Sequence, residues 1–334
     1  MSRYAAAYAD PKGPGDARPT ALDVIRDEGA IGKLAGKVVV ITGTSSGIGI
    51  ELARAIAATD ATLFLTARNL SKAREALGDL LKSKKVILVE MELESFDSVR
   101  AAAKTILSRT DKVNILINNA GIMAVPTLQH TREGHELHFG TNHLGHFLFF
   151  QLLKPALLAA TTPELQSRVV SVASSAHRSS GLNETDNYAY QKGGYDAQLA
   201  YGQSKTANIY MANEIERRYG NQGLHATSLH PGGSITGLTR HMPDGVVESL
   251  VSQFGLENTL QSHAQAAATM AWAAVGREWE DKGGKYLVNC EVTPPVAVDA
   301  AHFDDVGYAE HAYNPAEEAR LWKDSLKMVG MEDD

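Results

Sequence analysis

Short apolar segments alternate with amphipathic helical segments along most of this 334-residue chain, and this alternation limits the possible folds more than any other feature. Strands that are apolar on both faces are typical of a parallel sheet that helices cover on both sides. Because right-handed crossovers connect such strands, the pattern predicts an α/β fold with a doubly wound, seven-stranded parallel sheet of the Rossmann type. The expected strands are residues 38–41, 62–65, 86–89, 113–117, 169–172, 226–229 and 286–288.

The sequence predicts one folded domain preceded by an extension. No low-complexity linker divides residues 37–330, and no internal repeat is visible apart from the alternation itself. Residues 1–36 are rich in proline and glycine and contain only a short amphipathic stretch near residues 22–25. This composition predicts an N-terminal extension of irregular structure that lies on the surface.

Composition and charge exclude several classes of protein. Hydrophobic residues make up 44% of the chain and charged residues 21%, as in ordinary globular proteins. The formal net charge of -7 argues against a nucleic-acid partner, since phosphate binding needs a basic surface. The single cysteine, Cys290, excludes an internal disulfide and suits a reducing compartment. No apolar run approaches the roughly 20 residues of a membrane helix, and Asp10 and Pro11 interrupt the first alanines before they could form a signal peptide. We therefore expect a cytoplasmic protein with no membrane partner.

A glycine-rich loop, TGTSSGIG at residues 42–49, directly follows the first expected strand. Gly43 would permit a tight turn, and Gly47 and Gly49 would let the backbone approach a pyrophosphate. The N-terminus of the next helix would supply free N–H groups and the positive end of a dipole. The spacing differs from the G-x-G-x-x-G fingerprint, so a purely structural turn is the alternative. The position between a strand and a helix favours a dinucleotide site.

The end of the second expected strand indicates which dinucleotide binds. An acidic residue there would accept a hydrogen bond from the ribose 2′-hydroxyl, whereas an arginine can pair with a 2′-phosphate. Residues 66–69 read TARN and contain no acid. Arg68 therefore favours NADP (NADPH) over NAD, the alternative being a solvated surface arginine.

Tyr201 and Lys205 lie four residues apart in a helical segment that runs to residue 218. Residues at this spacing stand on the same face of a helix. A tyrosine ordinarily loses its proton near pH 10, and a nearby ammonium would favour the phenolate and lower that pKa. The pair therefore predicts a general acid/base, although a Tyr-x-x-x-Lys spacing by itself is common.

Four further motifs stand at the carboxyl ends of expected strands, and together they resemble the short-chain dehydrogenase/reductase family. They are the glycine loop, NNAG at residues 118–121, RVVSVAS at 168–174 and HPG at 230–232. The resemblance covers about residues 36–330. Within the family the chain is most similar to the retinol dehydrogenase and WW-domain oxidoreductase branch, on segments 141–147, 200–205 and 321–325. Its proline-rich start resembles fungal pathway reductases, which implies secondary metabolism.

The resemblance implies four catalytic residues. Ser174 would donate a hydrogen bond to the substrate oxygen, and Tyr201 would give or take its proton. Lys205 would bind the nicotinamide ribose and depress the tyrosine pKa, while Asn142 would hold a water that passes the proton to solvent. Preplaced donors would thus meet the charge that develops on the oxygen, and the cofactor supplies the hydride. The next residue, Ser175, is the alternative to Ser174, but adjacent strand residues face opposite ways.

The resemblance also implies a cofactor site assembled from several strand ends. Glu92 and Leu93, in place of the usual Asp-Leu, would lie beside the adenine, and either the carboxylate or the backbone alone would contact it. Thr236 would contact the nicotinamide carboxamide. The implied cofactor-binding residues are Gly43, Ser45, Ser46, Gly47, Ile48, Gly49, Arg68, Asn69, Glu92, Leu93, Asn119, Ala120, Gly121, Tyr201, Lys205, Pro231, Gly232 and Thr236.

Two segments are implied to form the substrate wall and lid, at about residues 178–199 and 237–263. The first carries three tyrosines and the second is apolar with few charges, which favours a fairly apolar substrate larger than a simple sugar. The sequence therefore predicts an NADP-dependent reductase of a ketone or aldehyde, or the reverse alcohol oxidation. The alternative is a non-redox protein on the same scaffold, a cofactor-sensing module or an isomerase or cyclase. The complete set of four catalytic residues argues against that alternative.

Two other readings concern residues 133–153. Gly140 interrupts a run of histidines and acids whose spacing occurs in metal-binding helices, and hydride transfer needs no metal. We therefore expect no metal site and histidines that satisfy hydrogen bonds or face solvent. The apolar helix that follows is expected to form core or a dimer surface, which leaves a homodimer or homotetramer open. The histidines and acids concerned are Glu133, His135, Glu136, His138, His143 and His146.

Overall fold

One eight-stranded sheet runs through the protein, in the order β3-β2-β1-β4-β5-β6-β7-β8. The structure is a computed structural model that describes residues 2–240, 242–243, 245–296 and 306–333. Neighbouring strands pair in parallel as far as β7, which confirms the doubly wound α/β fold expected from the alternation. The strands are β1 (Val38–Thr42), β2 (Thr62–Ala67), β3 (Val86–Glu90), β4 (Ile115–Asn118), β5 (Ser167–Val172), β6 (Leu224–Leu229), β7 (Tyr286–Val288) and β8 (Glu291–Val292).

The eighth strand was not expected from the sequence. It pairs antiparallel with β7 through a hairpin in which Val288 faces Glu291. The two turn residues, Asn289 and Cys290, have φ values of 56° and 54°, the left-handed conformation that two-residue hairpins use. A two-residue strand after a turn without glycine leaves too short an apolar pattern to be recognised.

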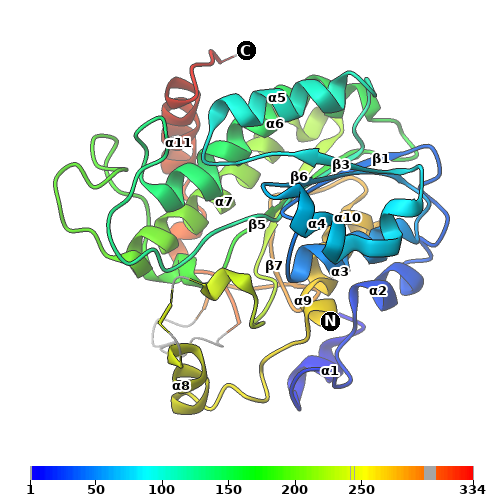
Figure 1. Ribbon diagram of the computed structural model, residues 1–334, viewed down its shortest axis with the longest axis horizontal. Coiled ribbons are helices and arrows are strands. Elements are labelled where there is room, and N and C mark those ends of the chain that lie inside the picture. The colour runs from blue at the N-terminus through cyan, green and yellow to red at the C-terminus, as the bar shows by residue number, and fades with distance from the viewer. Residues whose placement is uncertain (1, 241, 244, 297–305, 334) are drawn as a thin grey trace.

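Helices cover both faces of the sheet (Figure 1). The strand β1 shows how the two cores form, since Val38 and Val40 pack into one core and Val39 and Ile41 into the other. The helices α5 (Phe96–Leu107), α6 (Gly145–Ala160) and α7 (Ala197–Tyr219) contribute to the first core. The helices α3 (Ile48–Ala57), α4 (Leu70–Leu77) and α10 (Ala268–Val275) contribute to the second. The remaining short helices are η1 (Gly78–Lys82), η2 (Phe139–Leu144), η3 (Ser175–Ser179), η4 (Gly220–Gln222), η5 (Gly237–Thr239), α8 (Val246–Gln253), α9 (His263–Ala266), η6 (Arg277–Trp279) and η7 (Glu310–Ala312).

The N-terminal extension is more regular than the sequence suggests. It contains α1 (Ala5–Ala9) and α2 (Ala21–Asp27), where irregular structure was expected. Thr20 and Asp23 form a reciprocal capping box at the start of α2. Val24 and Ile25 are fully buried in the second core, beside residues of α3 and α10. Tertiary packing therefore stabilises a helix that is too short to form alone.

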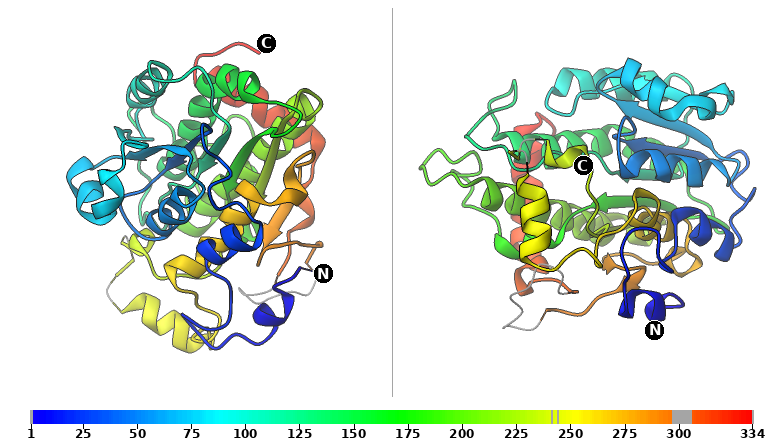
Figure 2. Two further views of the ribbon diagram at one scale, coloured as in Figure 1. Left: turned by 90° about the vertical axis from the view of Figure 1, so that its right-hand side faces the viewer. Right: turned by 60° about the horizontal axis from the view of Figure 1, so that its bottom comes forward.

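The C-terminal helix α11 (Pro315–Met328) lies against α6 and α7 (Figures 1 and 2). Trp322 packs edge-on against Phe147, with 5.0 Å between the ring centroids, and also contacts Phe150 and Tyr219. The sequence assigns the apolar residues of α6 either to the core or to a dimer surface. In the structure they belong to the first core, to which α11 contributes Trp322.

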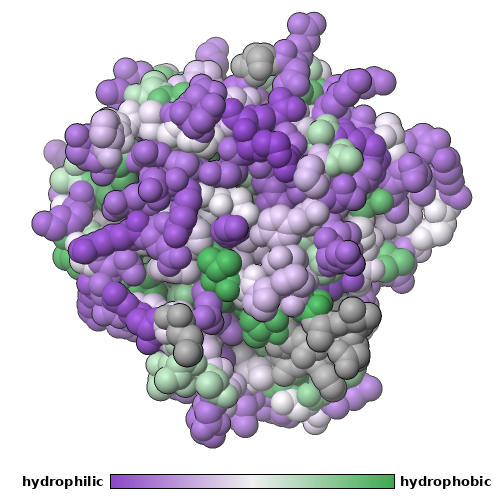
Figure 3. All heavy atoms as spheres, turned by 180° about the vertical axis from the view of Figure 1, so that it is seen from behind, coloured by the Kyte–Doolittle hydropathy of each residue, from purple (hydrophilic) through white to green (hydrophobic). Residues whose placement is uncertain are grey.

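The face opposite to that of Figure 1 is largely hydrophilic, with apolar residues in small separate patches (Figure 3). Among the described residues, no helix combines the length and the apolar character needed to cross a membrane.

Candidate active site

A cavity of about 760 Å³ opens at the carboxyl ends of the parallel strands. Its walls come from the segments that follow β1 to β6, together with the first turns of α7. Ligands of doubly wound sheets bind at this edge, where the strand order reverses. The reversal lies between β1 and β4, next to the glycine loop.

Close contacts require the three glycines of the first loop. Gly43 has a φ of 76°, and a Cβ there would lie 2.8 Å from Cα of Ala120. Gly47 also has a positive φ, and its Cβ would lie 3.1 Å from the Thr236 side chain. A Cβ on Gly49 would overlap the carbonyl oxygen of Gly43. The loop therefore exposes its backbone toward the cavity, with Ser45, Ser46 and Ile48 on the lining, whereas Gly47 itself does not line it.

The NNAG segment is tied to this loop by hydrogen bonds. Thr42 Oγ1 accepts from the backbone N–H groups of Asn119 and Ala120, both at 3.0 Å. The Asn119 side chain donates to the carbonyl oxygens of Thr42 and Gly43, at 2.8 and 3.2 Å. The ends of β1 and β4 are therefore fixed to one another, and Ala120 and Gly121 face the cavity.

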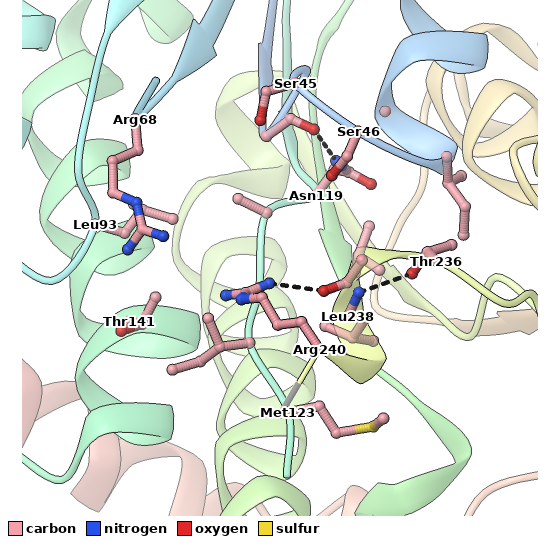
Figure 4. Close-up of a pocket in the computed structure, with 18 of the residues that line it drawn as sticks. Ser45, Ser46, Arg68, Leu93, Asn119, Met123, Thr141, Thr236, Leu238 and Arg240 are labelled. Carbon is pink, nitrogen blue, oxygen red and sulfur yellow. Dashed lines mark hydrogen bonds between the residues drawn. The ribbon is translucent and has the colours of Figure 1, made fainter. Parts of the chain in front are cut away.

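A cationic wall stands where the sequence places a 2′-phosphate (Figure 4). Arg68 lines the cavity and donates to Glu94 at 2.8 Å. Lys72 and Arg240 line the same cavity, and the sequence analysis missed both. Partial burial and the nearby charge of Arg68 lower the pKa of Arg240. Asn69 also lines the cavity, but its side chain caps α4 by accepting from the N–H of Lys72.

Helix α7 presents Tyr201 and Lys205 on one face. Asp196 caps the helix by accepting from two N–H groups of its first turn, each at 2.9 Å. Both Tyr201 and Lys205 are buried and line the cavity, and the Lys205 ammonium lies 5.5 Å from the centroid of the tyrosine ring. Lys205 Nζ donates to the carbonyl oxygen of Val172 at 3.0 Å, which ties α7 to the end of β5.

Burial dominates the protonation of this pair. It lowers the pKa of Lys205 to about 7 and raises the pKa of Tyr201 to about 12. A hydrogen bond with Ser174 opposes the second shift. From the spacing alone, the lysine charge would lower the tyrosine pKa, but in this site desolvation is the larger effect.

Ser174 lines the cavity at the end of β5, whereas Ser175 does not. Ser174 Oγ accepts from the backbone N–H of Ala176 at 3.1 Å. Ser175 Oγ is buried and has no hydrogen-bond partner among the described residues. Of the two serines, only Ser174 is placed to meet a substrate beside Tyr201.

Asn142 is fully buried next to the cavity lining but does not line the cavity itself. It lies in η2, a π-helical turn that leads into α6. Its side chain donates to the carbonyl oxygen of Ile122 at 3.0 Å and to Ser204 Oγ at 2.9 Å, and accepts from the Ile122 N–H at 2.9 Å. A Cβ on Gly121 would lie 3.2 Å from Asn142 Oδ1 and 3.5 Å from Lys205 Nζ. Asn142 and Lys205 therefore approach each other beside Gly121, although Asn142 is not part of the lining.

The turn after β6 completes the cavity opposite the glycine loop. Pro231, Gly232 and Thr236 all line it. Thr236 Oγ1 accepts from the N–H of Leu238 at 3.1 Å and starts η5, as the dashed line in Figure 4 shows. Glu92 and Leu93 line the far end, where the Glu92 carboxylate pairs with Arg132 at 3.1 Å.

The histidines of residues 135–146 point to separate partners. His138 binds the buried Glu136 through Nδ1 at 2.8 Å, His143 binds Ser325 at 2.8 Å, and His146 binds Thr42 at 2.9 Å. In the described part of the chain, no three His, Cys, Asp or Glu side chains group as metal ligands would.

The structure thus brings most of the expected residues to one cavity. All of the implied catalytic and cofactor residues line it except Gly47 and Asn142, which stand directly behind the lining. Two cationic lining residues, Lys72 and Arg240, lie in segments without a motif, and the sequence did not single them out. Only the charge of Arg240, within a lid of few charges, could have indicated it.

Comparisons with known proteins agree with this architecture. The family model described as short chain dehydrogenase matches residues 37–246. The short-chain dehydrogenase/reductase prx1 of Penicillium roqueforti is 46% identical over 330 residues, 98% of this chain and 95% of that protein. Retinol dehydrogenase 12 of Mus musculus is 32% identical over 304 residues, 90% of this chain and 88% of that protein. The crystal structure of an uncharacterized protein from Mycobacterium paratuberculosis superposes with a TM-score of 0.67 at 28% identity, covering 95% of this chain and 99% of that one.

Proposed function

The chain belongs to the short-chain dehydrogenase family, and from this premise we propose that it reduces a ketone or aldehyde with NADPH. The observation that carries the proposal is the convergence of Ser174, Tyr201 and Lys205 on one cavity with the glycine loop and the cationic wall. A hydrogen-bond donor for the carbonyl oxygen, a proton donor and a dinucleotide cradle therefore share a single space.

The residues around the cavity have distinct tasks in this reaction. The bound nicotinamide supplies the hydride. Ser174 Oγ donates to the substrate oxygen and holds it beside Tyr201, whose hydroxyl gives the proton as negative charge develops. Lys205 is anchored by Val172 and directs its ammonium toward the ring face of Tyr201. Asn142 stabilises the turn at Ile122 and lies beside Lys205, where it would hold a water that passes the proton onward.

The protonation of Tyr201 suits its role as the acid of carbonyl reduction. Because burial raises the pKa of this phenol to about 12, the proton stays on the tyrosine at neutral pH. Carbonyl reduction needs that protonated form, whereas alcohol oxidation needs the phenolate. The same residues could catalyse oxidation at higher pH.

The cationic wall supports NADPH over NADH. Arg68 takes the place of the acidic residue that would accept from a ribose 2′-hydroxyl, and Lys72 and Arg240 add two cations on the same cavity. Glu94 neutralises part of this charge through its ion pair with Arg68. The glycine loop fits a pyrophosphate, since Gly43 and Gly49 leave no room for side chains.

The cavity wall supports a fairly apolar substrate. Met123, Leu137 and Leu238 line it, with Gln129 and Thr141 as neutral polar groups. Met123 precedes Ala124, whose φ of 57° turns the chain sharply at this wall. We propose a carbonyl compound of secondary metabolism that is larger than a simple sugar.

The cellular setting of the protein is also a proposal. Cys290 is buried and unpaired, which suits a reducing compartment such as the cytosol. Because α11 covers the apolar face of α6 and α7 within the same chain, we propose that the protein acts without an oligomeric partner on that face.

Replacing Tyr201 with phenylalanine tests the assignment. The variant keeps the ring and loses the transferable proton, so we expect kcat to fall by about 10²–10⁴-fold, the contribution of a general acid, while NADPH binds as in the wild type. Turnover is followed by the absorbance of reduced nicotinamide with a panel of apolar ketones and aldehydes, and NADPH binding by fluorescence. Retained reduction by the variant would overturn the assignment. NADPH binding without turnover of any carbonyl by the wild type would favour a cofactor-sensing module.

A further inference from the structure

A buried arginine links the N-terminal extension to the end of the lid. Arg18 lies outside the family match, and it is only 4% exposed. Its charge is balanced by Asp16, at 2.9 Å. Burial opposes ionisation of that carboxyl, but hydrogen bonds from Arg18 and the backbone lower its pKa to about 2. A buried ion pair of this kind indicates a fixed position for the extension.

The Arg18 guanidinium holds three consecutive carbonyl groups at the end of the lid. It donates to the carbonyl oxygens of Thr259 at 2.7 Å, Leu260 at 2.6 Å and Asn258 at 3.3 Å. The backbone adds one more link, since the N–H of Gly13 donates to the Asn258 carbonyl at 2.9 Å. The planar fork of an arginine can serve several acceptors at once, which a lysine cannot.

Gln265 provides a second link between the extension and the same region. Its side-chain oxygen accepts from the N–H of Gly15 at 2.8 Å, and its nitrogen donates to Asp16 Oδ1 at 3.0 Å and to the Arg18 carbonyl at 3.1 Å. The residue is buried, so the two links enclose the start of α9.

The segment held by Arg18 leads directly to the cofactor wall. The N–H of Gln261 donates to the carbonyl oxygen of Gly233 at 2.8 Å, and the Gln261 amide packs so closely on Gly232 that a Cβ there would overlap it. His263 binds the carbonyl oxygen of Ile235 at 2.8 Å. Gly232 and Gly233 line the cavity in the turn that leads to Thr236. The residues just before the lid, 233–235, are therefore hydrogen-bonded to the residues at its end, 261–263.

We propose that Arg18 is a positioning residue that sets the conformation of the 230–236 turn, and through it the affinity for the nicotinamide cofactor. The extension fixes the position of residues 258–261, and these residues in turn fix the cofactor-binding turn at 230–236. The helix α8, which lies between residues 233–235 and 261–263, has no buried residue. This inference rests on the proposed function, because it names NADPH as the ligand.

The test compares Arg18→Gln and Arg18→Lys with the wild type, with Arg26→Gln as the matched control. Arg26 lies in the same extension but is exposed, and it pairs with Asp23 on its own helix. The Kd for NADPH, measured by fluorescence titration, is expected to rise about tenfold in R18Q, the effect of one hydrogen bond. R18K is expected to fall between R18Q and the wild type, and R26Q to bind as the wild type does. At saturating NADPH, kcat should stay within about twofold of the wild type while KM for NADPH rises with Kd.

A purely structural role would give a different result. If R18Q lowers Tm but binds NADPH with the wild-type Kd, the proposal is wrong. If R18Q does not fold, hydrogen exchange on the wild type decides: added NADPH should protect the amides of Gly13, Gly15 and Gln261, and unchanged exchange there overturns the proposal. Failure of the wild type to bind NADPH would instead refute the proposed function.

Discussion

Replacing Lys205 with methionine is expected to make the protein more stable, by an amount that depends on pH. Burial lowers the pKa of this lysine from its ordinary 10.5 to about 7. A folded-state pKa below the unfolded one means that the unfolded chain binds more protons between these two values. The wild-type free energy of unfolding therefore rises with pH from about 7 to 10.5, and the penalty for the buried charge is complete below pH 7.

The size of the effect follows from the shift. One pKa unit corresponds to about 1.4 kcal/mol, so the buried lysine costs about 4 kcal/mol at pH 7 and about 2 kcal/mol at pH 9. Methionine removes this cost but also loses the hydrogen bond to the Val172 carbonyl, worth about 1 kcal/mol. The net gain is about 3 kcal/mol at pH 7 and about 1 kcal/mol at pH 9.

Urea unfolding of both proteins at pH 6, 7, 8 and 9 measures this difference. Groups that do not feel the Lys205 charge shift their protons alike in both proteins and cancel when the two curves are subtracted. His146 and His230, whose pKa that charge helps to lower, are neutral in the folded protein at pH 6 and above. Lys72→Met serves as the control, because Lys72 is exposed and should show no such trend. A stability difference between K205M and the wild type that does not change with pH would refute the reasoning, and so would a K205M that is less stable at every pH.

Three further perturbations follow from the structure. Arg68→Gln should raise the Kd for NADPH by about ten- to a hundredfold, the value of a charged hydrogen bond, with little change for NADH; an equal change for both cofactors in fluorescence titration would contradict the 2′-phosphate assignment. Burial lowers the pKa of His143 and His230 to about 3 and of His146 and His177 to about 4. Below pH 6.5 the folded state therefore binds fewer protons than the unfolded chain, and the free energy of unfolding should fall steeply from pH 6.5 to 4. A urea midpoint that stays constant over this window would argue against neutral buried histidines. Trp322→Ala should cost about 3–5 kcal/mol in urea unfolding, and an unchanged urea midpoint would contradict its place in the core. Light scattering should give the monomer mass of 35.9 kDa for the wild type, and a dimer mass would contradict this expectation.

The sequence predicts the sheet well because the relevant signals are local. A parallel strand buried on both faces is a continuous apolar run, and each of the seven expected strands overlaps one in the structure. The glycine loop and the Tyr201–Lys205 spacing are likewise local, since close approach and helix periodicity act within a few residues. β8 and α2 escape prediction because their stability comes from a hairpin turn and from packing against distant helices.

Two of the contacts at or near the active site that the sequence does not reveal are long-range. Arg18 is separated from its carbonyl partners by more than 240 residues at Thr259 and Leu260, and no residue pattern near position 18 announces the contact. Arg240 likewise joins the cationic wall from a segment far from Arg68 in sequence. Such contacts depend on the tertiary arrangement of segments that are far apart in sequence, and local periodicity does not predict that arrangement.

The Tyr201–Lys205 pair shows why residue identity and spacing do not fix protonation. From spacing alone, the ammonium should stabilise the phenolate and lower the tyrosine pKa. In the structure both groups are buried at the same depth, and desolvation penalises each charged form, so the phenol holds its proton and the lysine loses much of its charge near neutrality. A site in this state suits proton donation, because the acid is fully protonated when a carbonyl binds. Reduction should therefore persist from pH 6 to 8, whereas oxidation of the corresponding alcohol should become faster as pH rises toward the tyrosine pKa.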